Sequence, residues 1–319
     1  MIARYAIPFF FLMGLVVVPL VVALICRWLL PRKYYLKVIS VLTLLIWGLV
    51  GYGYFVGFEQ LEIREIEYAC SDLPEAFDGY RIVHFSDAHI GTYTGSRQWL
   101  LQRAVDTINA LRPDIVLFTG DLQNIYPDEL DVQVPILSQL KAHDGVMSVL
   151  GNHDYAVYQD CDESQKQRNN KHTIQSERKM GWTLLLNENR IIRRDSDSIV
   201  IAGMENWGKM KRMPRRGNVK KSLTGISDSA FVVMLQHDPT CWREKILPGC
   251  KAQLTLSGHT HGGQVSLLGL SPASLSYDEW GGVYEQDGRT LIVSTGLGAL
   301  IPFRLGMPGE IVVITLRKK

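Results

Sequence analysis

The sequence has few cysteines, and no two of them form a Cys-x-x-Cys pair. Common zinc-binding and redox-active motifs place two cysteines at that spacing, so the chain carries neither motif. Of the five cysteines, Cys26 lies in an apolar stretch and the other four are scattered along the chain. These four are an even number, which permits disulfides in an oxidising compartment without requiring them, and we expect free thiols.

The chain also lacks internal repeats, low-complexity tracts and a large excess of either charge. Without a repeat, a solenoid or another repeat architecture is excluded. The formal net charge is only +2, so bulk charge argues neither for nor against a nucleic-acid partner. The length of 319 residues suffices for one large domain and an additional segment.

Two long stretches near the N-terminus contain no charged residue. They run from Tyr5 to Cys26 and from Val38 to Phe58, over 22 and 21 residues. About 20 apolar residues are enough for a helix to cross a bilayer. A signal peptide has one such stretch and a buried core helix usually has a polar face, whereas two stretches around a short basic loop favour a helical hairpin. We therefore predict a transmembrane hairpin over residues 1–58 and a second domain over residues 59–319.

The segment between the two apolar stretches is basic. It contains Arg27, Arg32, Lys33 and Lys37, and the nearest basic residues beyond the two stretches are Arg4 and Arg64. Loops rich in Lys and Arg stay on the cytoplasmic side of a membrane. The prediction is a multi-pass protein of the inner (cytoplasmic) membrane, with the N-terminus and everything after Phe58 on the extracytoplasmic face.

After Glu59 the pattern changes to short apolar runs that alternate with amphipathic stretches. The predicted buried strands are Tyr80–Ser86, Asp114–Thr119, Val146–Leu150, Ile199–Met204, Phe231–Leu235, Gln253–Leu256, Leu291–Ser294 and Ile311–Leu316. A helix is predicted between the first two, with Ser96 as its cap and Pro113 after its end. Strand, helix and strand at this spacing imply a layered α/β domain. The polar segment Gln159–Lys179 is predicted to be a surface helix or an insertion.

Polar side chains follow five of the predicted strands. They are Asp87 and His89 in HFSDAH, Asp121 in LFTGD, Asn152, His153 and Asp154 in VLGNHD, His237 and Asp238 in MLQHD, and His259 and His261 in LSGHTH. A single histidine after a strand is more often a hydrogen-bonded loop residue than a ligand. Active sites of open α/β sheets, however, lie beyond the carboxyl ends of the strands. Five such strand ends together indicate a metal site, because a cation readily neutralises converging carboxylates and imidazoles.

The motifs DxH, GD, GNHD, a lone His and GHxH, in that order, resemble the calcineurin-like metallophosphoesterases over Leu61–Leu316. The resemblance implies a layered α/β fold of two packed mixed β-sheets flanked by helices, here preceded by the two-helix hairpin. The GHTHGGQ form and the late STGLG…PFR…GEIVV segment are similar to a membrane-associated branch. That branch includes UDP-diacylglucosamine pyrophosphohydrolases and related phosphodiesterases.

The resemblance also implies a site for two divalent metal ions. The first ion would be held by Asp87, His89, Asp121 and His261, and the second by Asp121, Asn152, His237 and His259. Asp121 would bridge the ions, since a carboxylate has two oxygens. The glycines of GHTHGG allow a tight turn from which the two imidazoles diverge to different ions. Nitrogen and oxygen ligands without a thiolate suit Mn, Fe, Zn or Mg, and we expect Mn.

The resemblance implies that a hydroxide bridging the two ions would attack phosphorus in line, without a phosphoenzyme. The resemblance assigns to His153 contact with the phosphate and protonation of the leaving oxygen; the alternative is a structural loop histidine. Many relatives have an aspartate where this chain has Asn124, in GDLQN. An asparagine orients the ring by a hydrogen bond but does not stabilise its positive charge. Either Asp154 compensates, or His153 acts mainly as a neutral donor.

A basic segment, WGKMKRMPRRGNVKK, is a candidate for substrate binding. Its cations are Lys209, Lys211, Arg212, Arg215, Arg216, Lys220 and Lys221. They suit anionic lipid headgroups or phosphates; nucleic acid is the competing partner and a solvated loop the plain alternative. The predicted hairpin favours a phospholipid membrane and a lipidic substrate. Arg304, in IPFRLG, is a further candidate at the edge of the site.

Three hypotheses about function follow. The first is a membrane-anchored dimetal phosphohydrolase that acts on a lipid or lipid-linked phosphoester or diphosphate at the outer face. The second is a UDP-2,3-diacylglucosamine pyrophosphohydrolase of lipid A synthesis, whose cytoplasmic substrate conflicts with the topology derived from charge. The third is a non-catalytic metal-binding or interaction protein. It would be expected to have an eroded ligand set, whereas all seven ligand positions are filled here.

Overall fold

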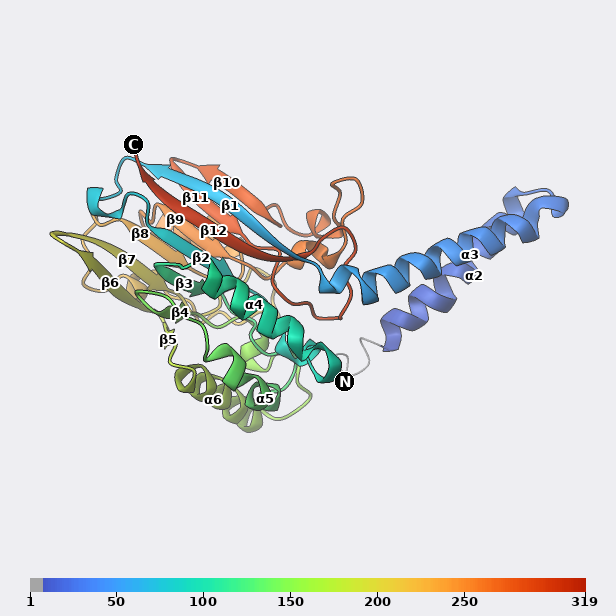
Figure 1. Cartoon of the computed structure of the whole chain (residues 1–319), viewed down its shortest axis with the longest axis horizontal. Coiled ribbons are helices and arrows are strands. Elements are labelled where there is room, and N and C mark those ends of the chain that lie inside the picture. Colours follow the sequence, from blue (N-terminus) through green and yellow to red (C-terminus); the bar gives the residue numbers. More distant parts are fainter. Residues whose placement is uncertain (1–7) are drawn as a thin grey trace.

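Two mixed β-sheets of six strands each lie face to face, in a computed structural model that describes residues 8–319 (Figure 1). In spatial order the first sheet contains β1 (Leu61–Cys70), β12 (Gly309–Lys318), β2 (Arg81–Phe85), β3 (Ile115–Phe118), β4 (Val146–Ser148) and β5 (Thr183–Leu184). The second contains β10 (Gly282–Gln286), β11 (Arg289–Val293), β9 (Leu254–Ser257), β8 (Val232–Leu235), β7 (Asp197–Gly203) and β6 (Glu188–Arg194). The predicted fold class is confirmed.

All eight predicted strands are present, and four further strands were not predicted. The missed strands are β1, β5, β6 and β10. Each lies at an edge of its sheet, where one side of the strand has no neighbour. Three of them, β1, β6 and β10, carry polar side chains, as in LEIREIEYAC of β1, and so lack the apolar runs that mark buried strands. The fourth, β5, is only two residues long.

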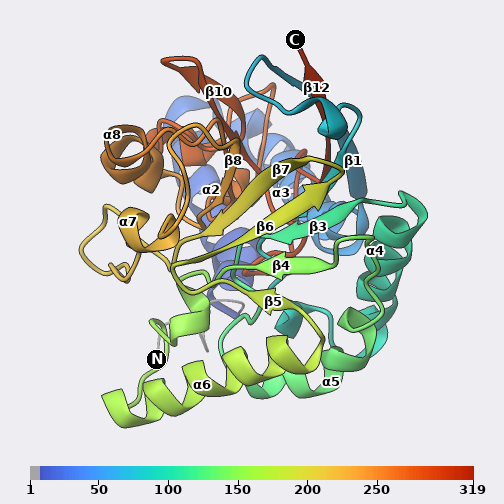
Figure 2. The same cartoon turned by 90° about the vertical axis from the view of Figure 1, so that its left-hand side faces the viewer.

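One hydrophobic core lies between the two sheets, and another of similar size lies under the helices. Alternate residues such as Ile82 and Val83 point to opposite faces of the first sheet, so Ile82 joins the core between the sheets and Val83 the core under the helices. The outer face of this sheet is covered by α4 (Gln98–Ala110), α5 (Asp128–Leu137) and α6 (Glu163–Lys179) (Figure 2). The short helices α7 (Val219–Ser222) and α8 (Leu247–Gly249) lie beside the second sheet.

One detail of the predicted helices needs correction, and one open alternative is decided by the structure. Ser96 does not cap α4: it lies in a 3-10 turn (Gly95–Arg97), and no side chain caps the helix. The polar segment predicted as a surface helix or an insertion does form α6, capped by Asp162. One face of α6 is nevertheless buried and includes Glu177, so this polar helix is part of the domain.

The two apolar stretches form helices that project from the domain (Figure 1). One span runs from Pro8 to Leu29 and ends in α2 (Val18–Leu29); the other, Arg32–Glu59, begins with α3 (Arg32–Phe55). Both are long and apolar enough to cross a bilayer, and their side chains are mostly exposed. The helical hairpin is as predicted, and its insertion into a membrane stays a prediction. Arg4 and the start of the first stretch, residues 5–7, lie outside the described residues.

The hairpin sits at the same end of the domain as the carboxyl ends of β2, β3 and β4. The strand β1 leads away from the hairpin, and β12 is parallel to it. The strand β2 is antiparallel to β12, and β3 and β4 are parallel to β2, so all three return toward the hairpin (Figure 1). Two hydrogen bonds join the base of the hairpin to the domain. The backbone N–H of Arg304 donates to Gly53 O at 3.0 Å, and the Arg97 side chain donates to Tyr54 O at 3.1 Å.

Candidate metal centre

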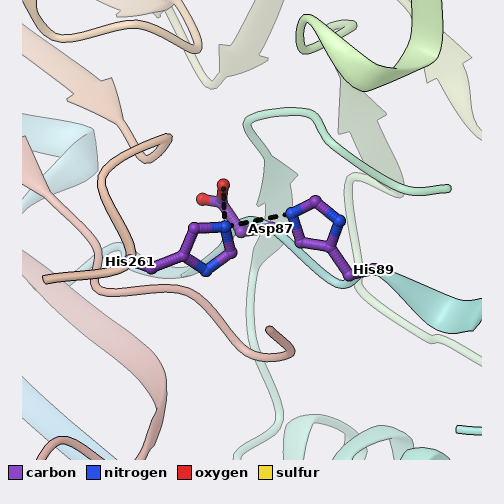
Figure 3. Close-up of side chains that lie close together, drawn as sticks. All are labelled: Asp87, His89 and His261. Carbon is purple, nitrogen blue, oxygen red and sulfur yellow. Dashed lines mark hydrogen bonds and ion pairs between the residues drawn. The ribbon is translucent and has the colours of Figure 1, made fainter. Parts of the chain in front are cut away.

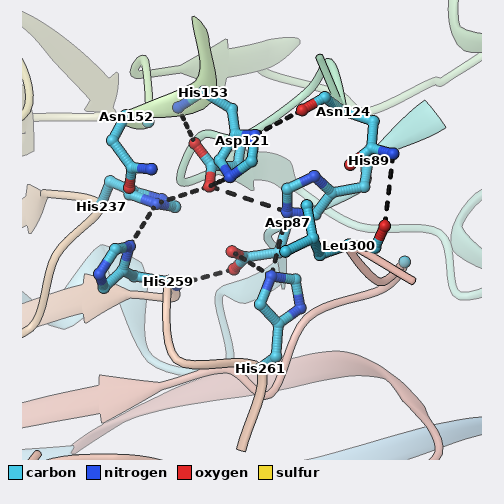
Figure 4. Close-up of polar contacts among 12 residues, drawn as sticks. Asp87, His89, Asp121, Asn124, Asn152, His153, His237, His259, His261 and Leu300 are labelled. Atoms are coloured by element: carbon cyan, nitrogen blue, oxygen red, sulfur yellow. Dashed lines mark hydrogen bonds and ion pairs between the residues drawn. The ribbon is translucent and has the colours of Figure 1, made fainter. Parts of the chain in front are cut away.

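The seven predicted metal ligands converge at the strand ends that face the hairpin (Figure 4). Asp87 and His89 follow β2, Asp121 follows β3, Asn152 follows β4, His237 follows β8, and His259 and His261 follow β9. Both sheets thus contribute. All the carboxylates and imidazoles of this set are nearly inaccessible to solvent.

One group of ligands consists of Asp87, His89 and His261 (Figure 3). The Nε2 atoms of the two histidines are 3.0 Å apart, and Asp87 Oδ1 is 3.4 Å from Nε2 of His261. Asp87 Oδ1 is buried without a hydrogen-bond partner. A buried carboxylate oxygen with no donor is costly, so these three atoms suit a cation between them.

The second group consists of Asp121, His237 and His259. His259 Nδ1 is 3.1 Å from His237 Nε2, which is 3.2 Å from Asp121 Oδ2. The same Asp121 oxygen is 3.7 Å from Nε2 of His89 in the first group, which is the placement that a bridging carboxylate requires. Asn152 Oδ1 is also buried without a partner, so the amide oxygen is free to act as a ligand.

The pKa values of the buried carboxylates and imidazoles indicate that this cluster lacks enough positive charge to balance its carboxylates. Burial alone would lower the pKa of His237, but the carboxylates of Asp121 and Asp87 raise it to about 10. Burial raises the pKa of Asp87 to about 6 and lowers that of His89 to about 3. The carboxylates therefore draw a proton onto the imidazole that they contact. Divalent cations at this position remove the same deficit, so the residues fit the metal ions.

The backbone of the ligand loops is strained at the ligands themselves. Five of the seven ligands have a positive φ: Asp87 (51°), His89 (41°), Asp121 (58°), His259 (74°) and His261 (54°). Such a conformation is uncommon for residues other than glycine and costs about 1–3 kcal/mol each. Strain concentrated on these residues indicates a functional constraint. In the turn after β9 it directs His259 to one group and His261 to the other, as predicted.

His153 lies at the mouth of the site, with its Nε2 atom 3.9 Å from Asp121 Oδ2. Its ring packs against that of Tyr158, at 4.4 Å between centroids. The expected hydrogen bond from the Asn124 amide is absent. Instead, the ring Nδ1 is bonded to the backbone carbonyl of Asn124 at 2.5 Å, and the Asn124 amide donates to Leu300 O. Main-chain geometry therefore orients the ring, whatever side chain stands at position 124.

Asp154 does not compensate for the missing aspartate. Its buried carboxylate accepts backbone N–H bonds from Asp121, Leu122, Gln123 and Gly151 at 2.8–3.3 Å. It joins the two loops that carry Asp121 and Asn152. This correction makes Asp154 a positioning residue for the candidate ligands, because its carboxylate is occupied by main-chain donors.

The three arginines of the basic segment, which were predicted to bind substrate, have different surroundings in the structure. Arg212 is exposed, and its guanidinium lies 6.0 Å from the centre of the Tyr158 ring, beside His153. Arg215 donates to main-chain carbonyls of its own loop, and Arg216 lies over the Tyr155 ring. Of these three, Arg212 borders the site.

Arg304 requires a correction, because it is completely buried. Its guanidinium donates to the carbonyl oxygens of Thr295, Gly296, Gly298, Met307 and Pro308. All of its donors face the main chain, so it holds the loop between β11 and β12 and has no free donor for a substrate.

Two residues at the site were missed by sequence reasoning. The hydroxyl of Tyr277 is 2.9 Å from Nε2 of His259, which leaves Nδ1 of that ring directed to His237. Tyr158 stacks on His153, and its hydroxyl is 3.4 Å from the Asn152 amide nitrogen. Neither tyrosine follows a predicted strand, so no motif marked them. A partner on the second ring nitrogen commonly fixes the orientation of a metal-binding histidine.

Comparison with known families and proteins agrees with this geometry. The model of the family "Calcineurin-like phosphoesterase" matches residues 80–263, and the chain belongs to this family. The chain is therefore a metal-dependent phosphoester hydrolase.

Individual relatives extend the likeness beyond the family model. The chain is 30% identical to the Bacillus subtilis "Uncharacterized metallophosphoesterase YkuE", over 84% of this chain and 90% of that protein. It is also 30% identical to the Danio rerio "Transmembrane protein with metallophosphoesterase domain", over 88% of this chain but only 63% of that protein. The Chlamydia trachomatis "UDP-2,3-diacylglucosamine pyrophosphatase LpxG" is 26% identical, over 75% of this chain and 85% of that protein.

Proposed function

We propose that this protein is a membrane-anchored dimetal phosphohydrolase that cleaves a phosphoester or diphosphate bond in a lipid or lipid-linked substrate. One observation carries the proposal: the strand ends that bear the ligands face the end of the domain to which the apolar hairpin is attached (Figure 1). A hairpin inserted in a bilayer would place the metal centre next to the lipid headgroups. Phosphate groups of amphiphilic molecules lie at that depth.

The ligand groups define how the ions would be held. Asp87, His89 and His261 would hold one ion, and His237 and His259 would hold the other. The amide oxygen of Asn152 would complete the second set, and Asp121 would be shared. The nitrogen and oxygen donors suit Mn²⁺, with Fe, Zn and Mg as alternatives. When bound, such a pair supplies a hydroxide nucleophile at neutral pH and stabilises charge on the phosphoryl oxygens.

The surrounding side chains have roles that follow from their positions. Arg212, exposed beside Tyr158, is placed to receive the phosphate at the mouth of the site. The carbonyl of Asn124 accepts the Nδ1 proton of His153, so the proton for the leaving oxygen must be a second one on Nε2. Burial lowers the pKa of His153. An anionic phosphate next to the ring opposes that effect and favours the protonated donor.

A second candidate is hydrolysis of the diphosphate of UDP-2,3-diacylglucosamine. The name of the Chlamydia trachomatis relative favours it. Its substrate is cytoplasmic, whereas the topology that we expect from the basic loop of the hairpin would put the catalytic domain outside the cytoplasm. A topology reporter fused after Lys319 separates the two candidates. A signal only from the extracytoplasmic side supports the lipid substrate at the outer face, and a signal only from the cytoplasm supports the nucleotide lipid.

The reaction is tested with the full-length, Mn-loaded protein reconstituted in phospholipid vesicles. The substrates are phospholipids, lipid-linked diphosphates, UDP-2,3-diacylglucosamine and soluble bis(p-nitrophenyl) phosphate. We expect hydrolysis of a lipidic substrate that EDTA abolishes. Hydrolysis of the soluble diester alone would contradict the lipid substrate while leaving the enzyme class intact.

The role of His153 is tested by His153→Ala in the same vesicles. We expect retention of the metal ions and a fall in kcat of about 10²–10⁴-fold, the usual contribution of general acid catalysis. His143→Ala is the matched control, because His143 is exposed and pairs with Asp144 instead of a predicted ligand. An unchanged kcat in the metal-loaded His153→Ala protein would rule out the proton-donor role.

A further inference from the structure

Four large apolar side chains next to the metal centre are exposed. Leu267, Leu268, Leu270 and Leu275 are 69%, 96%, 76% and 89% accessible. Within residues 59–319, all of which the structure describes, no other large apolar side chain is as exposed as these four. They lie in a stretch without charged residues, Val265–Tyr277, which starts four residues after the ligand His261. A cluster of exposed leucines of this kind marks an interaction surface.

The first three leucines form a tight turn whose sequence conflicts with its geometry. Leu267 and Leu270 exchange two backbone hydrogen bonds of 3.0 Å. The two residues between them, Leu268 and Gly269, have φ of 53° and 80°. Such a two-residue turn favours Asn-Gly, and a leucine with positive φ is strained. An exposed leucine at the tip of a turn makes too little contact within the domain to offset this strain. Its presence therefore indicates a stabilising contact with something outside the folded domain.

The leucine turn is connected to the base of the hairpin through the glutamine of GHTHGGQ. The Gln264 side chain donates to the carbonyls of Ile301 and Phe303 at 3.0 and 2.8 Å and accepts from Leu300 N. The Phe303 ring packs so closely on Gly53 of α3 that a Cβ there would overlap it. In Figure 1 the orange loop of residues 265–275 projects at the hairpin end of the domain.

We propose that the Leu267–Leu270 turn and Leu275 insert into the bilayer beside the hairpin and hold the metal centre at the depth of the lipid headgroups. The occupant of this surface is the acyl-chain region of a phospholipid membrane. The surface lies at the same end of the domain as the exposed apolar hairpin and carries no charge that a bilayer would exclude. The inference rests on the proposed function and narrows its substrate class to amphiphiles whose phosphate lies at the membrane interface.

A pair of variants in the full-length protein tests this role. In Leu268→Asn the new side chain suits the left-handed backbone, so we expect a higher Tm in detergent and unchanged hydrolysis of bis(p-nitrophenyl) phosphate. Hydrolysis of the lipidic substrate in vesicles should fall, and in the double variant Leu268→Asn/Leu275→Ser the fall should be at least about tenfold. The control is Ile191→Ser, a half-exposed apolar residue of β6, which should leave both reactions unchanged. Equal vesicle activity of the double variant and the wild type would overturn the proposal.

Membrane insertion is measured separately from catalysis by photolabelling. Vesicles contain a phospholipid with a diazirine on its acyl chain, and labelled peptides are identified by mass spectrometry. We expect label in the hairpin and in residues 265–276, and no label in β6. Label confined to the hairpin would overturn the insertion of the leucine turn and leave a protein partner as the occupant. Because labelling needs no turnover, it decides this point even if the wild type hydrolyses no lipid and the proposed function fails.

Discussion

Replacement of Asp154 by asparagine distinguishes a positioning role from a chemical one. In the wild type, one carboxylate oxygen accepts the N–H groups of Asp121 and Gly151, and the other accepts those of Leu122 and Gln123. The amide keeps one oxygen and turns an NH₂ group toward the other two donors. Each buried N–H that loses its acceptor costs about 1–3 kcal/mol, so we expect the free energy of unfolding to fall by roughly 3 kcal/mol.

For a domain of this size, that loss corresponds to a Tm about 6–12 °C lower. Because the two joined loops carry Asp121 and Asn152, metal affinity should fall by about 10–100-fold, and excess Mn²⁺ should restore much of the activity. The assay combines thermal unfolding in detergent with metal titration, and Asp228→Asn on the surface is the control. A variant with wild-type Tm and metal affinity but a low kcat would refute the reasoning and return Asp154 to the chemical step.

Two further changes have outcomes that the structure specifies. In Gly258→Ala the new Cβ would overlap Ser86 Oγ and Asp87 Oδ2, so metal analysis should show loss of the ion held by Asp87, whereas Gly249→Ala, where a Cβ has room, should bind metal normally. Burial raises the pKa of Glu177 well above its usual value. Its contribution to stability is therefore full below the unfolded pKa of about 4.3 and is lost as pH rises through the folded pKa, by up to about 1.4 kcal/mol per pH unit. Glu177→Gln should flatten this dependence in Tm measurements between about pH 5 and pH 9, and an unchanged slope would contradict the assignment.

The buried parts of the fold and the convergence of the candidate metal ligands could be predicted from the sequence. Strands such as β3 and β8 consist of consecutive apolar residues because both of their faces are covered. Residues that follow buried strands, such as Asp121 and His237, were expected to converge, and they do, although β3 and β8 belong to different sheets. The edge strands β1, β6 and β10 were missed because polar side chains that face solvent interrupt their apolar pattern, and β5 was missed because it has only two residues.

The surroundings of the ligands were less accessible, because they depend on contacts between distant segments. The charge of Arg304 suggested a substrate contact, but its donors are taken by carbonyls of the neighbouring loop. His153 is oriented by the main chain of Asn124, which carries no sequence signal. Tyr277 reaches His259 only through the path of the loop that follows the leucine turn. Composition alone does not reveal such pairings.

The metal content of the folded, full-length protein tests the central claim most directly. Purified protein is loaded with Mn²⁺ and measured by mass spectrometry of the metal, together with His259→Ala and His261→Ala. We expect about two ions per chain in the wild type and about one in each variant, because the two histidines belong to different ligand groups. A folded wild type that binds fewer than two ions would contradict the dimetal centre.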